Sequence, residues 1–227
     1  MDNNSLKYKR ISVFVGHYGS GKTNVALNYA LKIKQEQDDV SVADLDIVNP
    51  YFRTQDSANM LKENSIRLIA SEFAGSNVDL PAIPADVYSI FAGEDKYSVL
   101  DVGGDDRGAL ALGRFVPSIV ESGSFDVFFV INKYRPLTKT PELTVEVLHE
   151  VEQASGIKVT ALVNNSNLGE ATEAENILES LAYAEEVSRI TGIPVAFTTV
   201  REDLCPEVNI KNIMPMNLYV KQTWQDK

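Results

Sequence analysis

Eight residues near the start of the chain, Gly16-His-Tyr-Gly-Ser-Gly-Lys-Thr23, have the pattern G-x-x-x-x-G-K-[ST]. They follow the apolar run 11–15 and precede an amphipathic, helix-like stretch at residues 24–37. A strand that leads into a tight turn and then a helix directs consecutive backbone N–H groups, and the positive end of the helix dipole, at one point where phosphates can bind. In that arrangement Lys22 reaches the outer phosphates and Thr23 holds Mg²⁺. The sequence therefore predicts a phosphate-binding loop.

The loop resembles the variant phosphate loop G-K-G-G-x-G-K-T of the MinD/ParA-type ATPases, a superfamily that includes CobQ and CobB relatives. The additional lysine of that family, which in its dimers contacts the partner's nucleotide, is His17 here, and the next glycine is Tyr18. The resemblance implies ATP as the ligand and a homodimer that forms on ATP binding, although without the lysine on which dimeric activation depends. It implies these nucleotide-binding residues: Gly16, His17, Tyr18, Gly19, Ser20, Gly21, Lys22, Thr23 and Asn24.

Length and composition favour one domain, residues 1–227. A chain of 227 residues with 44% apolar content can bury roughly 70% of its unfolded surface in a single core. The net charge of −11 opposes nonspecific attraction to DNA and to anionic lipid, because both depend on clustered Lys and Arg. We therefore expect no nucleic-acid partner and no membrane association. The expected partners are ATP, ADP and an unknown client protein or metabolite.

Cysteine content and the composition of the termini indicate a cytoplasmic protein. Cys205 is the only cysteine, which excludes an internal disulfide and a Cys-x-x-Cys metal site. The first ten residues are polar and lack the apolar core of a signal peptide. No run approaches the roughly 18 uncharged apolar residues that a membrane-spanning helix requires. The tail from residue 217 is too short and too weakly amphipathic for a membrane-binding helix.

Short apolar runs alternate with helical patterns along the whole chain, which is typical of βαβ units and a parallel sheet. We expect an α/β protein with three layers and a mostly parallel sheet of about seven strands, the fold of P-loop NTPases. Strands are predicted at residues 11–15, 40–43, 66–70, 97–100, 127–131, 159–163 and 194–198. Helices are predicted at residues 22–37, 55–63, 85–91, 108–121, 141–154 and 170–190.

Two acidic motifs lie at predicted strand ends, where parallel sheets bind their ligands. Asp44-Leu-Asp46 follows the second strand, and the resemblance implies a metal-side role for Asp44 and a water-positioning role for Asp46. An Asp at a strand end also commonly caps the next turn. The fourth apolar run ends in Asp101-Val-Gly-Gly104, which indicates an acid that holds Mg²⁺ through a water and a glycine N–H that contacts the γ-phosphate. The expected metal site therefore comprises Thr23, Asp44 and Asp101.

Phosphoryl transfer also needs positive charge near the γ-phosphate. His17 does not supply it reliably, because an unperturbed imidazole is mostly neutral near pH 7. Arg53 and Arg107 follow the two acidic motifs and are the expected arginine fingers, acting in cis or across a dimer. Each could equally be an ion-pair partner at the surface.

The predicted strand at residues 159–163 ends in Asn164-Asn-Ser-Asn167, in the position where related GTPases have Asn-Lys-x-Asp. The Asp of that motif accepts hydrogen bonds from guanine, so its absence favours adenine, with Asn164 pairing with the base. The run Asn132-Lys-Tyr-Arg135 also suggests guanine recognition, but it lacks the Asp and follows a strand one place too early. We expect no role for that run in base recognition.

Together these residues predict a Mg²⁺-dependent ATPase. In this interpretation Lys22 and the loop amides bind the phosphates, Thr23 and Asp101 hold the metal, and Asp46 orients the attacking water. The ATP state would then reset residues 46–55 and 101–107, which would make the protein a switch acting on an unknown partner. Two alternatives stay open: an ATP-dependent ligase of the dethiobiotin-synthetase or cobyrinate-amidating type, and an ATP-binding regulatory module that does not hydrolyse ATP.

Overall fold

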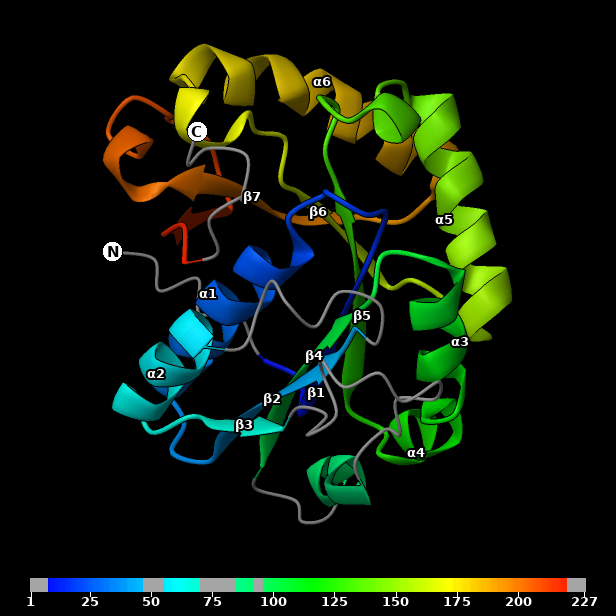
Figure 1. The fold of residues 1–227 in the computed structure, drawn as a ribbon. Helices are drawn as coiled ribbons and strands as arrows, with labels where there is room; N and C mark the ends of the chain where they lie inside the picture. The colour runs from blue at the N-terminus through cyan, green and yellow to red at the C-terminus, as the bar shows by residue number, and fades with distance from the viewer. Residues whose placement is uncertain (1–7, 47–54, 70–84, 92–95, 220–227) are drawn as a thin grey trace.

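The structure is a computed structural model, and it describes residues 8–46, 55–69, 85–91 and 96–219. Eight strands in these ranges form one sheet in the order β3-β2-β4-β1-β5-β6-β7-β8, and all neighbours are parallel. Figure 1 shows the sheet between helices on both sides. The strands are β1 (Ile11–Val15), β2 (Val40–Leu45), β3 (Arg67–Ile69), β4 (Tyr97–Val102), β5 (Phe125–Ile131), β6 (Ala161–Asn164), β7 (Val195–Arg201) and β8 (Ile213–Met216).

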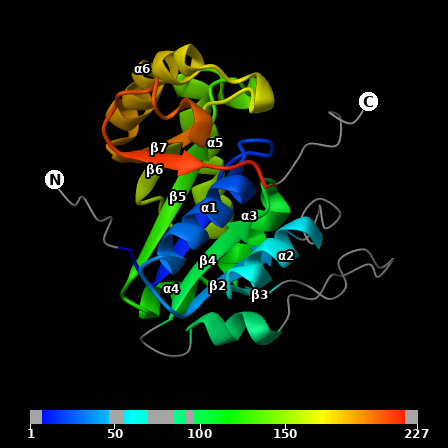
Figure 2. The same ribbon diagram turned by 90° about the vertical axis from the view of Figure 1, so that its left-hand side faces the viewer.

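The helices α1 and α2 lie on one face of the sheet, and α3, α4 and α5 lie on the other (Figures 1 and 2). No helix within the described ranges is long and apolar enough to cross a bilayer. The α-helices are α1 (Lys22–Lys34), α2 (Gln55–Glu63), α3 (Asp106–Gly113), α4 (Val116–Glu121), α5 (Pro141–Ser155) and α6 (Ala174–Thr191). Short 3-10 helices are η2 (Ala85–Phe91), η3 (Pro136–Thr138), η4 (Gly169–Ala171) and η5 (Glu202–Leu204).

Side chains of β1 alternate between the two faces of the sheet, as the period of a strand requires. Ile11, Val13 and Val15 pack in the core that contains Leu112 of α3, whereas Phe14 packs in the core beneath α1. All residues of β1 are buried, because helices cover both faces of a parallel sheet. The carboxyl end of β1, where the glycine-rich turn begins, is therefore held in place by the two cores.

The predicted α/β fold, with three layers and a parallel sheet, is confirmed, but the sheet has one more strand than the sequence predicts. The additional strand is β8, which contains Pro215. Proline has no N–H for the ladder, so a proline argues against a strand in sequence analysis. At the edge of the sheet, where β8 pairs with β7, a proline is tolerated.

The single helix predicted at residues 108–121 is two helices in the structure. α3 begins two residues earlier, and the side chain of Asp105 accepts a hydrogen bond of 2.9 Å from the backbone N–H of Gly108 at its start. α4 has Pro117 in its first turn. Because Pro117 has no N–H to donate to the carbonyl of Gly113, the first helix ends there. The helix predicted at residues 170–190 also begins later, after η4.

Candidate functional site

Three glycines with positive φ build the turn between β1 and α1, with φ of 142° at Gly16, 79° at Gly19 and 87° at Gly21. Residues with a Cβ rarely adopt this backbone region. Space is limited as well, since a Cβ on Gly16 would lie 2.6 Å from the carbonyl oxygen of Val130. Gly21 is the N-cap residue of α1 and offers no side chain to cap the first turn, so a bound anion can take that place.

The residues after the last glycine contribute an ammonium group and a hydroxyl group. Lys22 is 4% exposed, and its Nζ donates a hydrogen bond of 3.1 Å to the carbonyl oxygen of His17. The Oγ1 of Thr23 donates a hydrogen bond of 2.6 Å to the Oδ2 of Asp101 on β4. β4 neighbours β1 in the sheet, and Asp101 is in register with Phe14, so its carboxylate arrives beside the turn. A hydroxyl oxygen and a carboxylate oxygen at this distance suit Mg²⁺, which prefers oxygen ligands.

The acids at the carboxyl end of β2 reach the same edge of the sheet. Asp44 is in register with Asp101 on the neighbouring strand β4. Its Oδ1 accepts a hydrogen bond of 3.0 Å from the backbone N–H of Asp46, which is the turn-capping role of an aspartate. Asp46 is 8% exposed, and its Cγ lies 3.2 Å from the place where a Cβ on Gly103 would be. The predicted acids from β2 and β4 therefore lie together at one edge.

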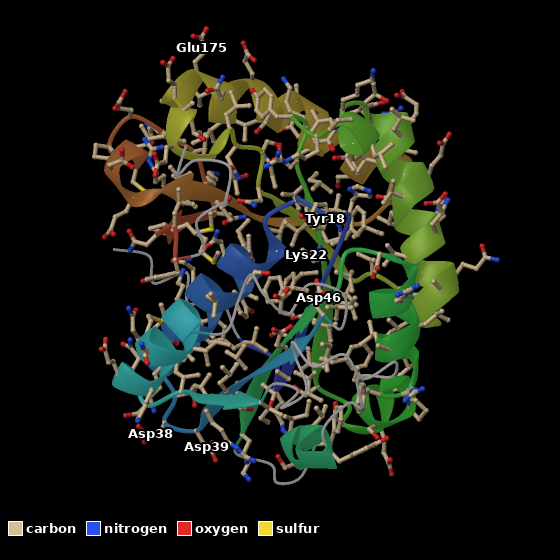
Figure 3. All side chains as sticks on the ribbon, in the orientation of Figure 1. Tyr18, Lys22, Asp38, Asp39, Asp46 and Glu175 are labelled. Atoms are coloured by element: carbon tan, nitrogen blue, oxygen red, sulfur yellow. The ribbon has the colours of Figure 1, made fainter. Side chains whose placement is uncertain are left out.

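The segment after β4 contacts the glycine-rich turn directly. The carbonyl oxygen of Gly104 accepts a hydrogen bond of 3.0 Å from the backbone N–H of Tyr18. A Cβ on Gly104 would lie 2.6 Å from that nitrogen and 2.7 Å from the Nζ of Lys22, so only glycine permits this approach. In Figure 3, Tyr18, Lys22 and Asp46 lie near the centre of the molecule, whereas Asp39 lies at its lower end.

Two neighbouring asparagines at the end of β6 have different partners. Asn164 is fully buried, and its Nδ2 donates a hydrogen bond of 2.8 Å to the Oγ of Ser180 on α6. Asn165 donates through its Nδ2 to the carbonyl oxygen of Ser20, at 2.6 Å, and accepts through its Oδ1 from the Oγ1 of Thr199, at 2.5 Å. Asn165 is therefore the asparagine that contacts the turn, and the pairing of Asn164 with the base stays a prediction.

Comparisons with known proteins support the fold but do not identify a family. No family model matches the sequence, and no curated protein matches it either. The fold is similar to the signal recognition particle receptor FtsY from Elizabethkingia anophelis, with a TM-score of 0.53 and 15% identity over 88% of this chain and 61% of that chain. It is also similar to the cell division protein FtsY from Thermotoga maritima, with a TM-score of 0.57 and 16% identity over 86% of this chain and 63% of that chain.

A third similar structure is the signal recognition particle 54 kDa protein from Aeropyrum pernix in complex with GDP. Its TM-score is 0.52, with 13% identity over 85% of this chain and 42% of that chain. The chain has the fold of a P-loop NTPase. It spans 61% and 63% of the lengths of the two FtsY structures. At these identities the likeness shows the P-loop NTPase fold and does not single out the MinD/ParA family.

Within this P-loop NTPase fold, the structure also places three further predicted residues: Arg107, His17 and Asn24. Arg53 lies outside the described residues. Arg107 is exposed in the first turn of α3. The Nδ1 of His17 donates a hydrogen bond of 2.8 Å to the carbonyl oxygen of Tyr18. The Oδ1 of Asn24 accepts a hydrogen bond of 3.0 Å from the backbone N–H of Tyr219, so this side chain contacts the segment that follows β8.

Two residues near the turn of this P-loop NTPase fold are not among the residues that the sequence predicts. Asn165 directly follows Asn164, the predicted residue, after the same buried strand. Arg135 belongs to the run 132–135, for which the sequence predicts no role in base recognition, yet its side chain lies beside Gly19. The available signal was positional, because both residues follow strands close to β1 in the sheet order.

Proposed function

We propose that the protein binds ATP with Mg²⁺ at residues 16–24, hydrolyses it, and uses the ATP state as a switch for an unknown partner. The observation that carries the proposal is the 2.6 Å hydrogen bond between Thr23 and Asp101, which joins two oxygen groups at the start of α1. Lys22, the residue before Thr23, is buried, and its ammonium group donates a hydrogen bond to the carbonyl oxygen of His17 in the turn. An anion-binding turn, a lysine and an oxygen pair are the parts that phosphoryl transfer requires.

The residues present fit Mg²⁺ as the metal. This ion is usually bound by one or two carboxylates, waters and substrate phosphates rather than by an all-protein cage. No group of three or more His, Cys, Asp or Glu side chains in the described ranges could hold a metal, so the phosphates would supply further ligands. Thr23 and Asp101 would hold the ion, with Asp44 as the additional metal-side residue. When bound, the ion would neutralise charge on the outer phosphates.

Adenine is the base that this site favours. Asn165 ties the turn to the end of β6, so we expect the base beside the segment that follows. Three residues after Asn164 is Asn167, and three residues after Asn165 is Leu168; neither has the carboxylate that guanine's N1–H and amino group require. Asn167 is also engaged, since its Nδ2 donates to the carbonyl of Asn165 at 2.8 Å and its Oδ1 accepts from Gly169 at 3.0 Å. Two of the similar structures contain GDP, so GTP is the competitor to test.

Asp46 is the residue that we propose to orient the attacking water. It is buried at the end of β2 and lies against Gly103 in the segment after β4. In the same segment Gly104 is bonded through its carbonyl to Tyr18 of the turn. A γ-phosphate that recruits the N–H of Gly104 would change this contact, and α3 begins only two residues later. The phosphate state would in this way reach a helix at the surface.

Phosphate release from ATP distinguishes these functions. We expect the wild type to release phosphate without an added acceptor, and Asp46→Ala to do so at least about 100-fold more slowly, with ATP affinity within about threefold of wild type. Asp39→Ala is the matched control, because Asp39 is exposed and lies at the other end of the molecule (Figure 3). Equal background rates with tight ATP binding would indicate a regulatory module, and strict dependence on a metabolite would indicate a ligase.

Dimer formation on ATP binding is a separate part of the proposal. The position of the lysine that crosses between subunits in MinD/ParA-type dimers is occupied by His17, whose Nδ1 is bonded within its own turn. A dimer of this protein would therefore need other contacts. Light scattering with and without Mg²⁺ and ATP measures the change in mass, and an unchanged monomer would remove the dimer from the proposal.

A further inference from the structure

Arg135 lies between β5 and η3, and hydrogen bonds fix its backbone. Its N–H donates to the carbonyl oxygen of Asn132 at 3.1 Å, and its carbonyl accepts from the N–H of Thr138 at 3.1 Å. The preceding turn is fixed as well, since the Oδ1 of Asn132 accepts a hydrogen bond of 3.0 Å from Tyr134. The side chain of Arg135 thus starts from a defined position just after β5, the strand next to β1.

The guanidinium group of Arg135 lies against the glycine-rich turn. A Cβ on Gly19 would have the Nε of Arg135 at 3.7 Å, its Cδ at 3.8 Å and its Cζ at 4.0 Å. These are ordinary packing distances for an added Cβ, so the side chain of Arg135 lies beside Gly19 of the turn. Lys22 and Arg135 therefore bring two cationic side chains to the same turn, one from α1 and one from the end of β5.

The charge of Arg135 has no partner in the part of the chain that the structure describes. Its Nε is buried without a hydrogen-bond partner there, and no acidic side chain of those ranges forms an ion pair with it. By contrast, Arg201 is paired with Asp203, and Arg189 is paired with Glu186. A buried donor without a partner is costly, and a half-buried guanidinium beside an anion-binding turn gains most from an anion. The chain has a net charge of −11, so acidic partners for an arginine are abundant in its sequence. That Arg135 pairs with none of them in the described ranges indicates an anionic ligand as its partner.

We propose that Arg135 binds phosphate oxygens of the nucleotide held by the turn, and so supplies the positive charge that His17 does not provide. This inference rests on the proposed ATP site. A guanidinium is always charged and offers paired N–H groups that match two phosphate oxygens, whereas His17 is engaged with the carbonyl of Tyr18. Arg135 is a phosphate-binding residue that belongs to this chain's own site, without a contribution from a second subunit.

The test is ATP binding by two variants that keep an aliphatic stem, one without the charge and one with the charge but without the paired N–H donors. We expect Arg135→Gln to weaken binding of ATP with Mg²⁺ by about 10- to 100-fold in a calorimetric titration. Arg135→Lys should regain part of this loss, because it keeps a charge without the paired donors. Arg114→Gln is the control, since Arg114 is an exposed arginine at the end of α3, and its affinity should stay within about twofold of wild type.

A merely structural role of Arg135 gives a different pattern. If Arg135 only packs against Gly19, the Gln and Lys variants would lose ATP affinity equally, or Arg135→Gln would bind ATP as the wild type does; either result overturns the inference. Thermal unfolding without nucleotide checks that the variants are folded. If Arg135→Gln does not fold, the ATP affinity of Arg135→Lys is compared with that of the wild type instead. Failure of the ATP site itself is recognised separately, because the wild type would then not bind ATP and Lys22→Ala would change nothing.

Discussion

The hydroxyl group of Thr23 donates a hydrogen bond of 2.6 Å to the carboxylate of Asp101, although the two residues are 78 positions apart in the sequence. The contact exists because β4 lies beside β1, so the end of one strand meets the helix that follows the other. Because the two oxygen atoms are already neighbours, both could bind the same cation. In the proposed function this contact marks the place of Mg²⁺ between the protein and the phosphates.

Removal of the Thr23 hydroxyl should therefore affect binding only when Mg²⁺ is present. We expect Thr23→Ala to weaken ATP binding by about 10- to 100-fold with Mg²⁺, and by no more than about twofold with EDTA. Thr23→Ser keeps the hydroxyl group and should bind as the wild type does. Calorimetric titration in both buffers measures the effect, and an equal loss with and without Mg²⁺ would speak against a metal role for Thr23.

The two asparagines at the end of β6 form a matched pair for a second prediction. Both Asn164→Ala and Asn165→Ala remove buried hydrogen bonds and should lower the free energy of unfolding by about 1–3 kcal/mol. Only Asn165→Ala should also weaken ATP binding, because only Asn165 holds the carbonyl of Ser20 in the turn. Urea unfolding and ATP titration measure the two effects. A loss of ATP affinity confined to Asn164→Ala would contradict this prediction and support the pairing of Asn164 with the base.

A third prediction concerns the close approach of Gly104 to the turn. In Gly104→Ala the new Cβ would collide with the backbone nitrogen of Tyr18, which cannot swing away as the end of a side chain can. We expect the segment after β4 to shift, at a cost of about 1–3 kcal/mol in stability, and ATP hydrolysis to fall. Thermal unfolding and phosphate release test this, and a variant with wild-type stability and turnover would show that the contact is dispensable.

A fourth prediction follows from the only cysteine. Burial raises the pKa of the Cys205 thiol above its ordinary value, and the negative charges of Glu202 and Asp203 raise it further. A raised pKa leaves less thiolate at a given pH, so alkylation by iodoacetamide should be slower than that of glutathione and should still accelerate with pH where the alkylation of glutathione has levelled off. The rate profile against pH checks this, and a rate that levels off at lower pH than that of glutathione would contradict the shift.

Features that depend on short stretches of sequence could be predicted. The bounds of β1 and α2 agree with the prediction, because each is set by local pattern and by residues that begin or end the element. The meeting of Asp44 and Asp101 also follows from sequence, since parallel strands bring their carboxyl ends to one edge of the sheet. The glycine-rich turn is predicted from the spacing of its residues and from the strand and helix patterns beside it, and its three positive φ values agree with that pattern.

Features that depend on a one-residue register or on distant contacts could not be predicted. Successive residues at a strand end point to opposite faces, so a shift of one position exchanges the partner of Asn164 for that of Asn165. The side chain of Arg135 lies beside Gly19, more than a hundred residues away in the sequence, and nothing in the local pattern indicates this. The edge position of β8, which permits Pro215, is likewise visible only once the strand order is known.

Calorimetric titration of the nucleotide-free protein with ATP and with GTP, both with Mg²⁺, tests the central claim most directly. We predict one ATP per chain, GTP binding weaker by about tenfold or more, and loss of at least about 100-fold in ATP affinity in Lys22→Ala. Absence of ATP binding, tighter binding of GTP, or an unchanged affinity in Lys22→Ala would contradict the account.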